Sequence, residues 1–535
     1  MNFLTGMLRS FGGSGLNKQL VIPMSGMGAR FIAAGYGLPK PLIEVAGKPI
    51  IQHVLEMYPN WENILFIVNS EHFNDKVLNL EEKLLQLAPA SKIHVVAPHK
   101  LGPTHAVLEA RDSLINDGPI VINYCDFAGI FNLEEYERKI FHYDSVLLTY
   151  TGFHPHMLRS TRFAYLKKID NEFVDIQEKQ SYTDSPMEEE ASAGAYSFRN
   201  RQLLLDSIAT QIKSGFILND ELYTSLTVKA LIQNGGTIAS TLMSKFFQWG
   251  TPDDLEEFKM QRDYFAFRNQ KRVSNNTVDR AEILAAGSGQ RFLDAGYKER
   301  KPFLPCGESF LALEALSALG TISGSKGLLL QGSFSLPNEI STSLEENGLV
   351  IEMVDGPTKG QAASALLALT RVNHGNCIIA TCDSLVFPRE SDKLASIRGK
   401  TLAVWVVNPS LFAKSHPAQF GWVNVSDKME VIKSWVKVKP DTKSEVMVIT
   451  GTFIFGDSAE AKILLNDFIS TGMTVNGEYY LDSVLSFAKE KGWTIVALEP
   501  EWFVSLGTPD EYETYLYWYS VFDERKDLLE SNEVM

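Results

Sequence analysis

The chain is poor in cysteine and has no long hydrophobic run. Its 535 residues include four cysteines, none of them in a CxxC pair, which favours buried or free thiols in a reducing compartment. No apolar run reaches the roughly 18 residues that a membrane-spanning helix needs. Residues 1–17 are glycine-rich and lack the apolar core of a secretory signal, so we expect a flexible leader. These absences predict a cytoplasmic protein without a membrane span.

Basic residues are also in deficit. The sequence has 50 Lys and Arg against 65 Asp and Glu, a formal net charge of −15. A nonspecific nucleic-acid partner needs a basic face, so this balance predicts no such partner. A nucleotide is still compatible with the charge, because a phosphate needs only a local cluster of donors.

The sequence is long and contains an internal repeat. At roughly 100–200 residues per domain, the chain predicts at least two domains. Residues 26–31 (GMGARF) are matched by residues 287–292 (GSGQRF) at an offset of 261. The Cys-Asp pair at residues 125–126 is matched at 382–383, and the offset of 257 found there is kept by later blocks. A register kept over separate blocks predicts a tandem duplication.

The repeat sets the domain boundaries. We expect a first domain at residues 18–263, a polar linker at 264–278 and a second domain at 279–535. The residues from 523 onward are charged, and we expect them to be frayed.

Short apolar runs alternate with segments of helical apolar spacing. In the first copy we expect strands at residues 20–24, 63–69, 92–96 and 119–124, and helices at residues 49–58 and 104–114. This alternation predicts an α/β fold with two tandem doubly wound, mainly parallel sheets of Rossmann-like type. Ligands of such sheets bind at the carboxyl ends of the strands. The glycine loop and Asp126 both fall at such ends.

Residue types that bind phosphate follow the first strand. Gly26 and Gly28 let backbone N–H groups approach a phosphate, and Arg30 adds a fork of donors suited to phosphate oxygens. Lys40, which lies between two prolines, offers a compact positive charge. Asp126 supplies a carboxylate of the kind that a hard ion such as Mg²⁺ prefers.

Residues 22–53 contain the segment PKPLIEVAGKPI at residues 39–50. This region resembles the signature of the sugar-phosphate nucleotidylyltransferases, the nucleoside-diphosphate-sugar pyrophosphorylases. The resemblance extends over nearly all of the first domain and, more weakly, over the second. It implies a GT-A-like nucleotidyltransferase that transfers NMP from an NTP to a sugar phosphate or alcohol phosphate, releases pyrophosphate and uses Mg²⁺. The family's usual context implies precursors for surface polysaccharide such as capsule.

The resemblance also implies roles for single residues. Arg30 would hold the pyrophosphate, Lys40 would stabilise charge at the α-phosphorus, and Asp126 would bind Mg²⁺. The catalytic set over both domains is Arg30, Lys40, Asp126, Arg291, Lys301 and Asp383, with Asp126 and Asp383 as metal ligands. The nucleotide-binding set is Gly26, Met27, Gly28, Gly102, Gly287, Ser288, Gly289 and Gly360. The acceptor-binding set is Glu178, Lys179, Gly194 and Glu221.

The sequence departs from the family pattern at two places. The position of a second metal carboxylate holds Gln248 in the first domain and Ser505 in the second, so we expect Mg²⁺ to rest on Asp126, the phosphates and water. Residues 435–440 of the second domain (WVKVKP) have no glutamate beside a lysine. We therefore expect the first domain to be the main catalyst, and the second to use a different phosphate or to have lost turnover.

Several alternatives stay open. A GT-A-type glycosyltransferase would share the sheet, although such enzymes usually carry a D-x-D metal motif. The second domain could instead be a noncatalytic nucleotide-binding or structural partner, and a homo-oligomer is compatible with the sequence. His154 and His156 flank a proline, which is compatible with a transition-metal site, a wall of the acceptor pocket or a plain loop. Neither the base nor the acceptor is indicated by the sequence.

Overall fold

The protein divides into two compact units. The computed structural model describes residues 17–158, 163–270, 275, 276, 278–334, 336, 338–370, 374–389, 393–410, 413, 414, 416–442 and 444–529. Unit 1 comprises Met1–Phe267 and Ser520–Met535, and unit 2 comprises Arg268–Tyr519. The predicted leader lies almost wholly outside the described residues, as does part of the predicted linker.

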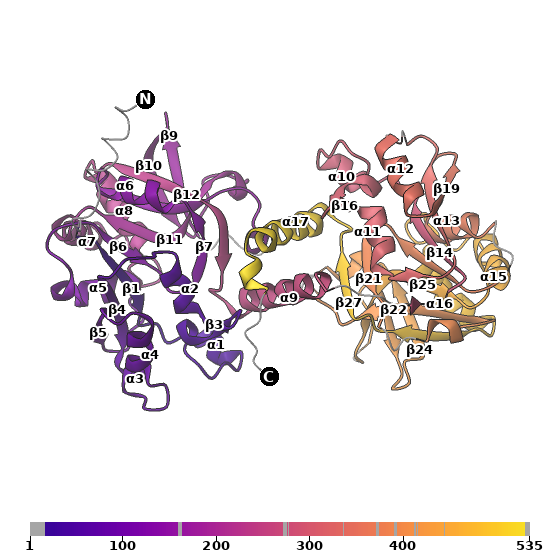
Figure 1. The fold of residues 1–535 in the computed structure, drawn as a ribbon, viewed down its shortest axis with the longest axis horizontal. Coiled ribbons are helices and arrows are strands. Elements are labelled where there is room, and N and C mark those ends of the chain that lie inside the picture. Colours follow the sequence, from indigo (N-terminus) through magenta and orange to yellow (C-terminus); the bar gives the residue numbers. More distant parts are fainter. Residues whose placement is uncertain are drawn as a thin grey trace, which may run out of the picture. The chain divides into compact units, whose positions relative to one another are not determined.

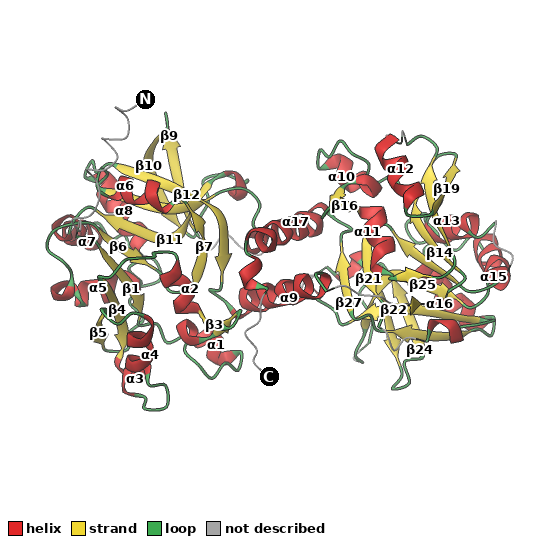
Figure 2. Ribbon diagram, viewed as in Figure 1, coloured by secondary structure: helices red, strands yellow, loops and turns green. Residues whose placement is uncertain are grey.

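Unit 1 alternates strands and helices from its first described residues onward (Figures 1 and 2). Its strands are β1 (Gln19–Met24), β2 (Glu44–Val45), β3 (Lys48–Pro49), β4 (Ile64–Asn69), β5 (Lys92–Val96), β6 (Ile120–Asn123), β7 (Phe127–Phe131), β8 (Ser145–Tyr150), β9 (Ala164–Ile169), β10 (Glu172–Glu178), β11 (Glu190–Phe198) and β12 (Ile238–Gln248). Its helices are α1 (Ala29–Ala33), α2 (Ile50–Glu56), α3 (Ser70–Asn74), α4 (Leu80–Leu87), α5 (Pro103–Glu109), α6 (Leu133–Ile140), α7 (Arg201–Lys213), α8 (Thr224–Gln233) and α9 (Pro252–Arg268).

The main sheet of unit 1 has the order β5-β4-β1-β6-β11-β8-β12-β7, and the β9–β10 hairpin is attached to β11. Strands β5, β4, β1 and β6 are parallel, because each connection between them crosses over the sheet through a helix. β11 is antiparallel to β6 and β8. A buried core of aliphatic and aromatic side chains joins the sheet to α5, α7 and α8. The predicted strands are confirmed, and the predicted helix at 104–114 is shorter, since α5 ends at Glu109 and a 3-10 turn follows.

Unit 2 repeats this succession of elements. Its strands are β13 (Asn275–Asn276), β14 (Arg280–Ala285), β15 (Pro305–Cys306), β16 (Ser309–Phe310), β17 (Thr321–Ile322), β18 (Ser325–Gln331), β19 (Leu349–Val354), β20 (Cys377–Thr381), β21 (Ser384–Phe387), β22 (Thr401–Val407), β23 (Gly421–Val425), β24 (Val431–Val436), β25 (Met447–Phe455), β26 (Thr494–Leu498) and β27 (Trp502–Ser505). Its helices are α10 (Gln290–Asp294), α11 (Leu311–Ala318), α12 (Asn338–Glu346), α13 (Gln361–Ala368), α15 (Ser458–Ser470), α16 (Leu481–Glu490) and α17 (Pro509–Glu524), whose end from Ser520 onward belongs to unit 1.

The main sheet of unit 2 has the order β19-β18-β14-β20-β25-β22-β26, with β23 and β24 attached to β25. This order reproduces that of unit 1 strand for strand up to β26. The long strand β12 of unit 1 corresponds to two strands in unit 2, β26 and β27, which are separated by Pro500. Proline cannot donate a ladder hydrogen bond, so it breaks a strand at this point. The fold class predicted from the sequence, two tandem α/β units, is confirmed.

The end of the chain differs from its prediction. The sequence-based boundary placed residues 520–535 in the second domain, whereas the described residues 520–529 belong to unit 1. Phe522 contacts Phe258 at a ring-centroid distance of 5.8 Å, and Leu528 is buried in a 3-10 turn. The expectation that the chain is frayed from residue 523 is therefore wrong for residues 523–529, because apolar side chains anchor them. The charged residues beyond 529 lie outside the described part.

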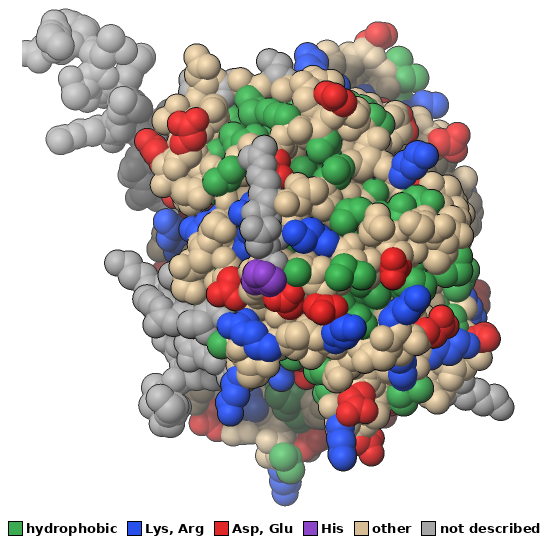
Figure 3. All heavy atoms as spheres, turned by 90° about the vertical axis from the view of Figure 1, so that its right-hand side faces the viewer, with side chains coloured by type: hydrophobic (Ala, Val, Ile, Leu, Met, Phe, Trp, Pro, Cys, Tyr) green, Lys and Arg blue, Asp and Glu red, His purple; other side chains and the backbone are tan. Residues whose placement is uncertain are grey.

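The cysteines, the helices and the surface side chains are typical of a globular protein. The four cysteines are buried and free. Among the described helices, none combines the length and the hydrophobicity of a membrane span. On the face of unit 2 shown in Figure 3, acidic and basic side chains are interspersed with apolar ones.

Candidate active site

The glycine loop follows the first strand in both units. Gly28 ends the loop after β1 with φ of 65° and caps α1. Gly289 does the same before α10, with φ of 67°. Glycine adopts this left-handed conformation without strain, which explains its presence at both positions. The buried Asn69 side chain donates a hydrogen bond to the Ser25 carbonyl at 3.0 Å and holds the first loop in place.

One arginine follows each glycine loop at the start of the short helix. Arg30 and Arg291 are both exposed. Within the described part of the chain, neither guanidinium forms a hydrogen bond or an ion pair. Their five N–H donors are therefore available to an anionic ligand.

A lysine–aspartate pair lies at the carboxyl end of the central strand in each unit. The Lys40 Nζ is 2.7 Å from Asp126 Oδ2, and the Lys301 Nζ is 2.6 Å from Asp383 Oδ2. Burial lowers the pKa of Lys40, but the Asp126 carboxylate outweighs it and the pKa is raised. The same balance raises the pKa of Lys301. Both lysines are thus fixed positive charges, and the structure brings together the sequence-predicted residues of each pair.

The end of strand β12 lies close to Asp126 in unit 1. Gln248 of β12 is paired with Phe127, the residue after Asp126. A Cβ on Gly250 would lie 3.0 Å from the Gln248 amide nitrogen and 3.3 Å from Asp126 Oδ2, so the two side chains converge there. The Gln248 side-chain oxygen is buried and accepts no hydrogen bond from the described residues. In unit 2 the corresponding position holds the Ser505 hydroxyl, near Asp383.

Gly102 and Gly360 must be glycine for the same structural reason. Each precedes a helix, α5 or α13, with φ of 89° or 112°. A Cβ on Gly102 would lie 2.6 Å from the Leu222 carbonyl oxygen, and one on Gly360 would lie 2.6 Å from the Tyr479 nitrogen. The glycines let the predicted base-binding loop pack directly on the backbone next to Glu221 and its counterpart.

The predicted acceptor residues of unit 1 lie together. The Glu178 carboxylate accepts a hydrogen bond from Ser225 at 2.6 Å. Lys179 has φ of 59° and hydrogen-bonds the Tyr223 hydroxyl. Burial raises the pKa of Glu178, and the Lys179 ammonium and the Ser225 hydrogen bond only partly offset this. A Cβ on Gly194 would lie 3.2 Å from the rings of both Tyr124 and Phe127, so aromatic side chains lie next to this glycine.

His154 and His156 belong to an aromatic cluster. His154 is buried, and burial lowers its pKa to about 4. His156 lies 3.2 Å from the Tyr150 hydroxyl, and both imidazoles pack on the ring of Phe246. In the described part of the chain, no group of three or more His, Cys, Asp or Glu side chains is arranged to hold a metal ion. The packing favours a structural role for the pair.

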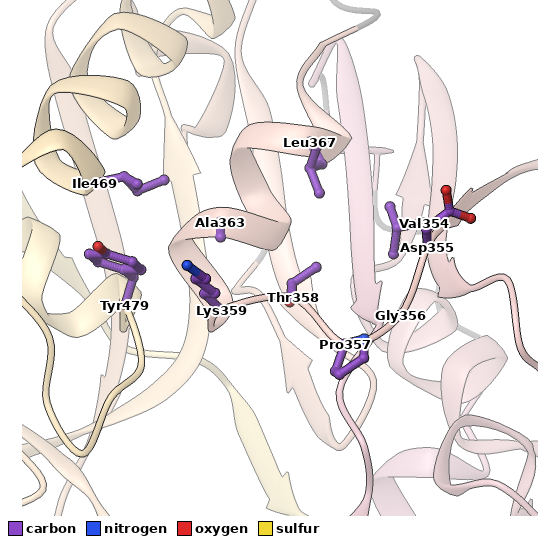
Figure 4. Close-up of a pocket in the computed structure, with 10 residues that line it drawn as sticks. All are labelled: Val354, Asp355, Gly356, Pro357, Thr358, Lys359, Ala363, Leu367, Ile469 and Tyr479. Carbon is purple, nitrogen blue, oxygen red and sulfur yellow. The ribbon is translucent and has the colours of Figure 1, made fainter. Parts of the chain in front are cut away.

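Unit 2 has a shallow hollow of about 370 Å³ beside the Gly360 loop (Figure 4). Lys359, Thr358 and Tyr479 lie on one side of it, and Leu367 of α13 lies on another. None of the phosphate-binding residues predicted in unit 2 lines it. The hollow therefore borders the predicted base-binding loop rather than the Lys301–Asp383 pair.

The geometry agrees with the comparisons to known proteins. Residues 20–262 match the family model described as Nucleotidyl transferase. Residues 20–262 of the first repeat therefore form a domain of the nucleotidyl transferase type.

Among curated proteins, the chain is similar to the bifunctional protein GlmU of Methanococcus maripaludis (strain C7), with 28% identity over 239 residues, 44% of this chain and 52% of that protein. It is also similar to the UTP--glucose-1-phosphate uridylyltransferase YngB of Bacillus subtilis, with 31% identity over 125 residues, 20% of this chain and 42% of that protein. The chain spans about half the length of the curated relatives it matches. A solved nucleoside-diphosphate-sugar pyrophosphorylase from Vibrio cholerae has 24% identity and a TM-score of 0.38, covering 45% of this chain and 98% of its own.

Proposed function

We propose that the protein transfers a nucleotidyl group from an NTP to a phosphorylated sugar or alcohol, with unit 1 as the main catalyst. The observation that carries this proposal is the half-buried Lys40–Asp126 pair at the strand end, next to a glycine loop and the exposed Arg30. Because one relative is a UTP–glucose-1-phosphate uridylyltransferase, UTP and glucose 1-phosphate are the first substrates to test. The product would be an activated precursor of the kind used for surface polysaccharide.

The reaction needs positioning and charge stabilisation more than covalent chemistry. An oxygen of the acceptor phosphate forms a bond to the α-phosphorus, and the bond from that phosphorus to the α–β bridging oxygen breaks. Pyrophosphate leaves with the bonding electron pair. Lys40 stabilises the charge that builds on the non-bridging oxygens, and Arg30 holds the departing pyrophosphate. Glu178 and Lys179 bind the hydroxyls and the phosphate of the acceptor.

Mg²⁺ fits the donor set of unit 1. Asp126 offers a carboxylate, and Gln248 offers a buried oxygen without a hydrogen-bond donor. A magnesium ion in proteins keeps several waters and is completed by substrate phosphates, so two protein oxygens are enough. When bound, the ion would neutralise phosphate charge. Asp383 and the Ser505 hydroxyl offer a corresponding pair in unit 2.

The test is pyrophosphate release by the full chain with each NTP, Mg²⁺ and a panel of sugar and alcohol phosphates. We expect release with one NTP and one acceptor class, and loss of release with a chelator. A Lys48→Met chain is the matched control, because Lys48 forms a surface ion pair with Glu56. The proposal fails if no combination releases pyrophosphate and no nucleotide-sugar product is cleaved by added pyrophosphate.

A further inference from the structure

The two units can be aligned at the strands that carry the acceptor lysine. Lys179 follows β10, and its backbone N–H donates to the Phe163 carbonyl at 2.8 Å. Lys437 follows β24, and its N–H donates to the Phe420 carbonyl at 3.0 Å. The two lysines also share a positive φ, 59° and 54°. Lys437 is therefore the counterpart of Lys179.

The register then identifies what has changed on the strands. Glu178 of β10 pairs with Ala164 in unit 1, whereas Val436 of β24 pairs with Gly421 in unit 2. The strand of unit 2 has lost its carboxylate, and the residue opposite has lost its side chain. These two changes occur at facing positions.

The helix beside these strands has gained a carboxylate. Helices α8 and α16 both begin after an extended tyrosine, Tyr223 or Tyr480. The second helical residue is Ser225 in α8, where its hydroxyl binds Glu178. In α16 the second residue is Asp482. The carboxylate has thus moved from the strand to the helix while staying next to the lysine.

Asp482 occupies the space that Gly421 leaves. A Cβ on Gly421 would lie 2.0 Å from Asp482 Oδ2, so the glycine is required for this placement. Asp482 is 7% exposed, and burial raises its pKa to about 6 although Lys437 lowers it. Among the described residues, no side chain donates a hydrogen bond to it. A buried carboxylate normally has such a donor, and the start of a helix favours its charge but does not explain the matching glycine.

The side chains around Gly194 and around its counterpart in unit 2 also differ. A Cβ on Gly194 of unit 1 would lie 3.2 Å from the rings of both Tyr124 and Phe127. The matching glycine of unit 2 is Gly451. A Cβ on Gly451 would lie 3.1 Å from the Thr381 hydroxyl oxygen and 3.5 Å from the Ser384 hydroxyl oxygen. Aromatic faces suit the apolar face of a sugar ring, whereas hydroxyls suit polar groups. A site that hydrogen-bonds a substrate hydroxyl discriminates strongly against an analogue without it.

We propose that unit 2 has a complete acceptor site, in which Asp482 and Lys437 replace Glu178 and Lys179, and that it transfers the nucleotidyl group to a second, more hydroxylated sugar or polyol phosphate. This inference rests on the nucleotidyl transfer proposed above. Lys437 binds the acceptor phosphate, and Asp482 accepts hydrogen bonds from its hydroxyls. The reaction centre is the Lys301–Asp383 pair, and the same bonds form and break as in unit 1.

The experiment uses two full-length chains with one site disabled in each. Asp126→Asn leaves the unit 2 site, and Asp383→Asn leaves the unit 1 site. Pyrophosphate release is measured for both with sugar phosphates and with polyol phosphates such as glycerol and inositol phosphates. We expect the acceptor that is best for one chain to be used at least tenfold less well by the other.

Asp482→Asn in the Asp126→Asn chain tests the relocated carboxylate. We expect the KM for the acceptor to rise at least tenfold, while the KM for the NTP stays within twofold. Lys437→Met should have the same selective effect, and it covers the case in which the Asp482 variant does not fold. Exchanging the arrangement, Val436→Glu with Asp482→Ser and Gly421→Ala, should move the acceptor preference toward that of unit 1. The matched control is Lys400→Met, which removes an exposed ion pair with Glu460 and should leave unit 2 turnover unchanged.

The outcomes separate this inference from the proposed function. If the Asp383→Asn chain turns over and the Asp126→Asn chain does not with any acceptor, unit 2 is inactive and the inference fails alone. Equal acceptor preferences in the two chains, or an Asp482→Asn effect on NTP rather than acceptor KM, would also overturn it. If neither chain nor the unmodified protein releases pyrophosphate, the proposed function fails first.

Discussion

The proposed phosphate-binding sides of units 1 and 2 are nearly identical, whereas their proposed acceptor sides are built differently. The lysine–aspartate distances agree within 0.1 Å, at 2.7 and 2.6 Å, and both glycine loops end in a left-handed glycine. The proposed acceptor carboxylate lies on a strand in unit 1, at Glu178, and on a helix in unit 2, at Asp482. Charge development at phosphorus is the same for every acceptor, so one geometry serves both units. Acceptor hydroxyls vary, so that half of the site can be rebuilt.

The largest expected effect is on the lysine–aspartate pair that occurs in both units. Lys40→Met in the Asp383→Asn chain should lower turnover at least about 100-fold, because a preorganised charge at the reacting group contributes that much. Lys301→Met in the Asp126→Asn chain should do the same for unit 2. Steady-state pyrophosphate release measures both effects, and Lys48→Met is the control. A tenfold difference between the two losses would break the equivalence of the phosphate sides.

The next effect is on stability, at the glycines of the two predicted base-binding loops. Gly102→Ala and Gly360→Ala should each lower the free energy of unfolding by about 3 kcal/mol, because the positive φ is strained for alanine and the added Cβ overlaps a backbone atom. Gly35→Ala is the matched control: φ is 87°, and a Cβ would meet no described atom within 4 Å. It should cost only about 1 kcal/mol. Chemical denaturation followed by hydrogen exchange assigns each loss to its unit.

The phosphate side was predictable because it is encoded locally. The spacing of Gly26, Gly28 and Arg30 lies within one loop, and Asp126 directly follows a buried strand. The tandem α/β organisation was equally visible, since strand runs and the repeat register are short-range patterns. The antiparallel strand β11 in the middle of the sheet was not, because its pairing with β6 and β8 is a long-range property.

The acceptor side of unit 2 could not be read from the sequence. The offset of 257 places Val436 opposite Lys179, whereas the backbone hydrogen bonds place Lys437 there, one residue later. The hairpins differ by one residue, and only strand register reveals it. Asp482 lies far from this lysine in the chain, so its role depends on the packing of α16 on β24. The packing of the last described residues was not predicted for a similar reason, since Phe522 is anchored by a side chain that is distant in the sequence.

The two units should also respond to pH in opposite directions. Burial holds the pKa of His154 near 4, below its ordinary value of 6.5, so the unfolded chain binds the proton first and unit 1 loses stability as pH falls from about 6.5 to 4. Burial raises the pKa of Glu282 in unit 2 to about 7 from 4.5, although Arg280 opposes this. Unit 2 therefore loses stability as pH rises from about 4.5 to 7. Each effect is on the order of 3 kcal/mol.

Hydrogen-exchange protection factors for peptides of each unit, measured between pH 4 and 7, test this contrast. Glu282→Gln should flatten the profile of unit 2 and leave that of unit 1 unchanged. His154→Phe should do the reverse, since the aromatic cluster around Phe246 accommodates a ring. Parallel profiles for both units in the unmodified protein would contradict the assignment.

The smallest expected effect concerns a matched pair of helix caps. Asn200 accepts a hydrogen bond from the Leu203 N–H at the start of α7, and Asp457 accepts two, from the Ala459 and Glu460 N–H groups, at the start of α15. Alanine at either cap should cost about 1 kcal/mol, with the larger loss at Asp457, because two helix N–H groups and the Gly375 N–H lose their acceptor and the helix N-terminus loses a favourable negative charge.

Reciprocal exchange separates these two contributions. Asp457→Asn keeps an acceptor oxygen and removes the charge, so it should cost only about 0.5 kcal/mol. Asn200→Asp should stabilise unit 1 by a similar amount, and both shifts should shrink in high salt because exposed charges are screened. Denaturant unfolding at two salt concentrations measures this. Equal losses for the two alanine variants at both salt concentrations would show that neither the additional hydrogen bond nor the charge makes the Asp457 cap stronger than the Asn200 cap.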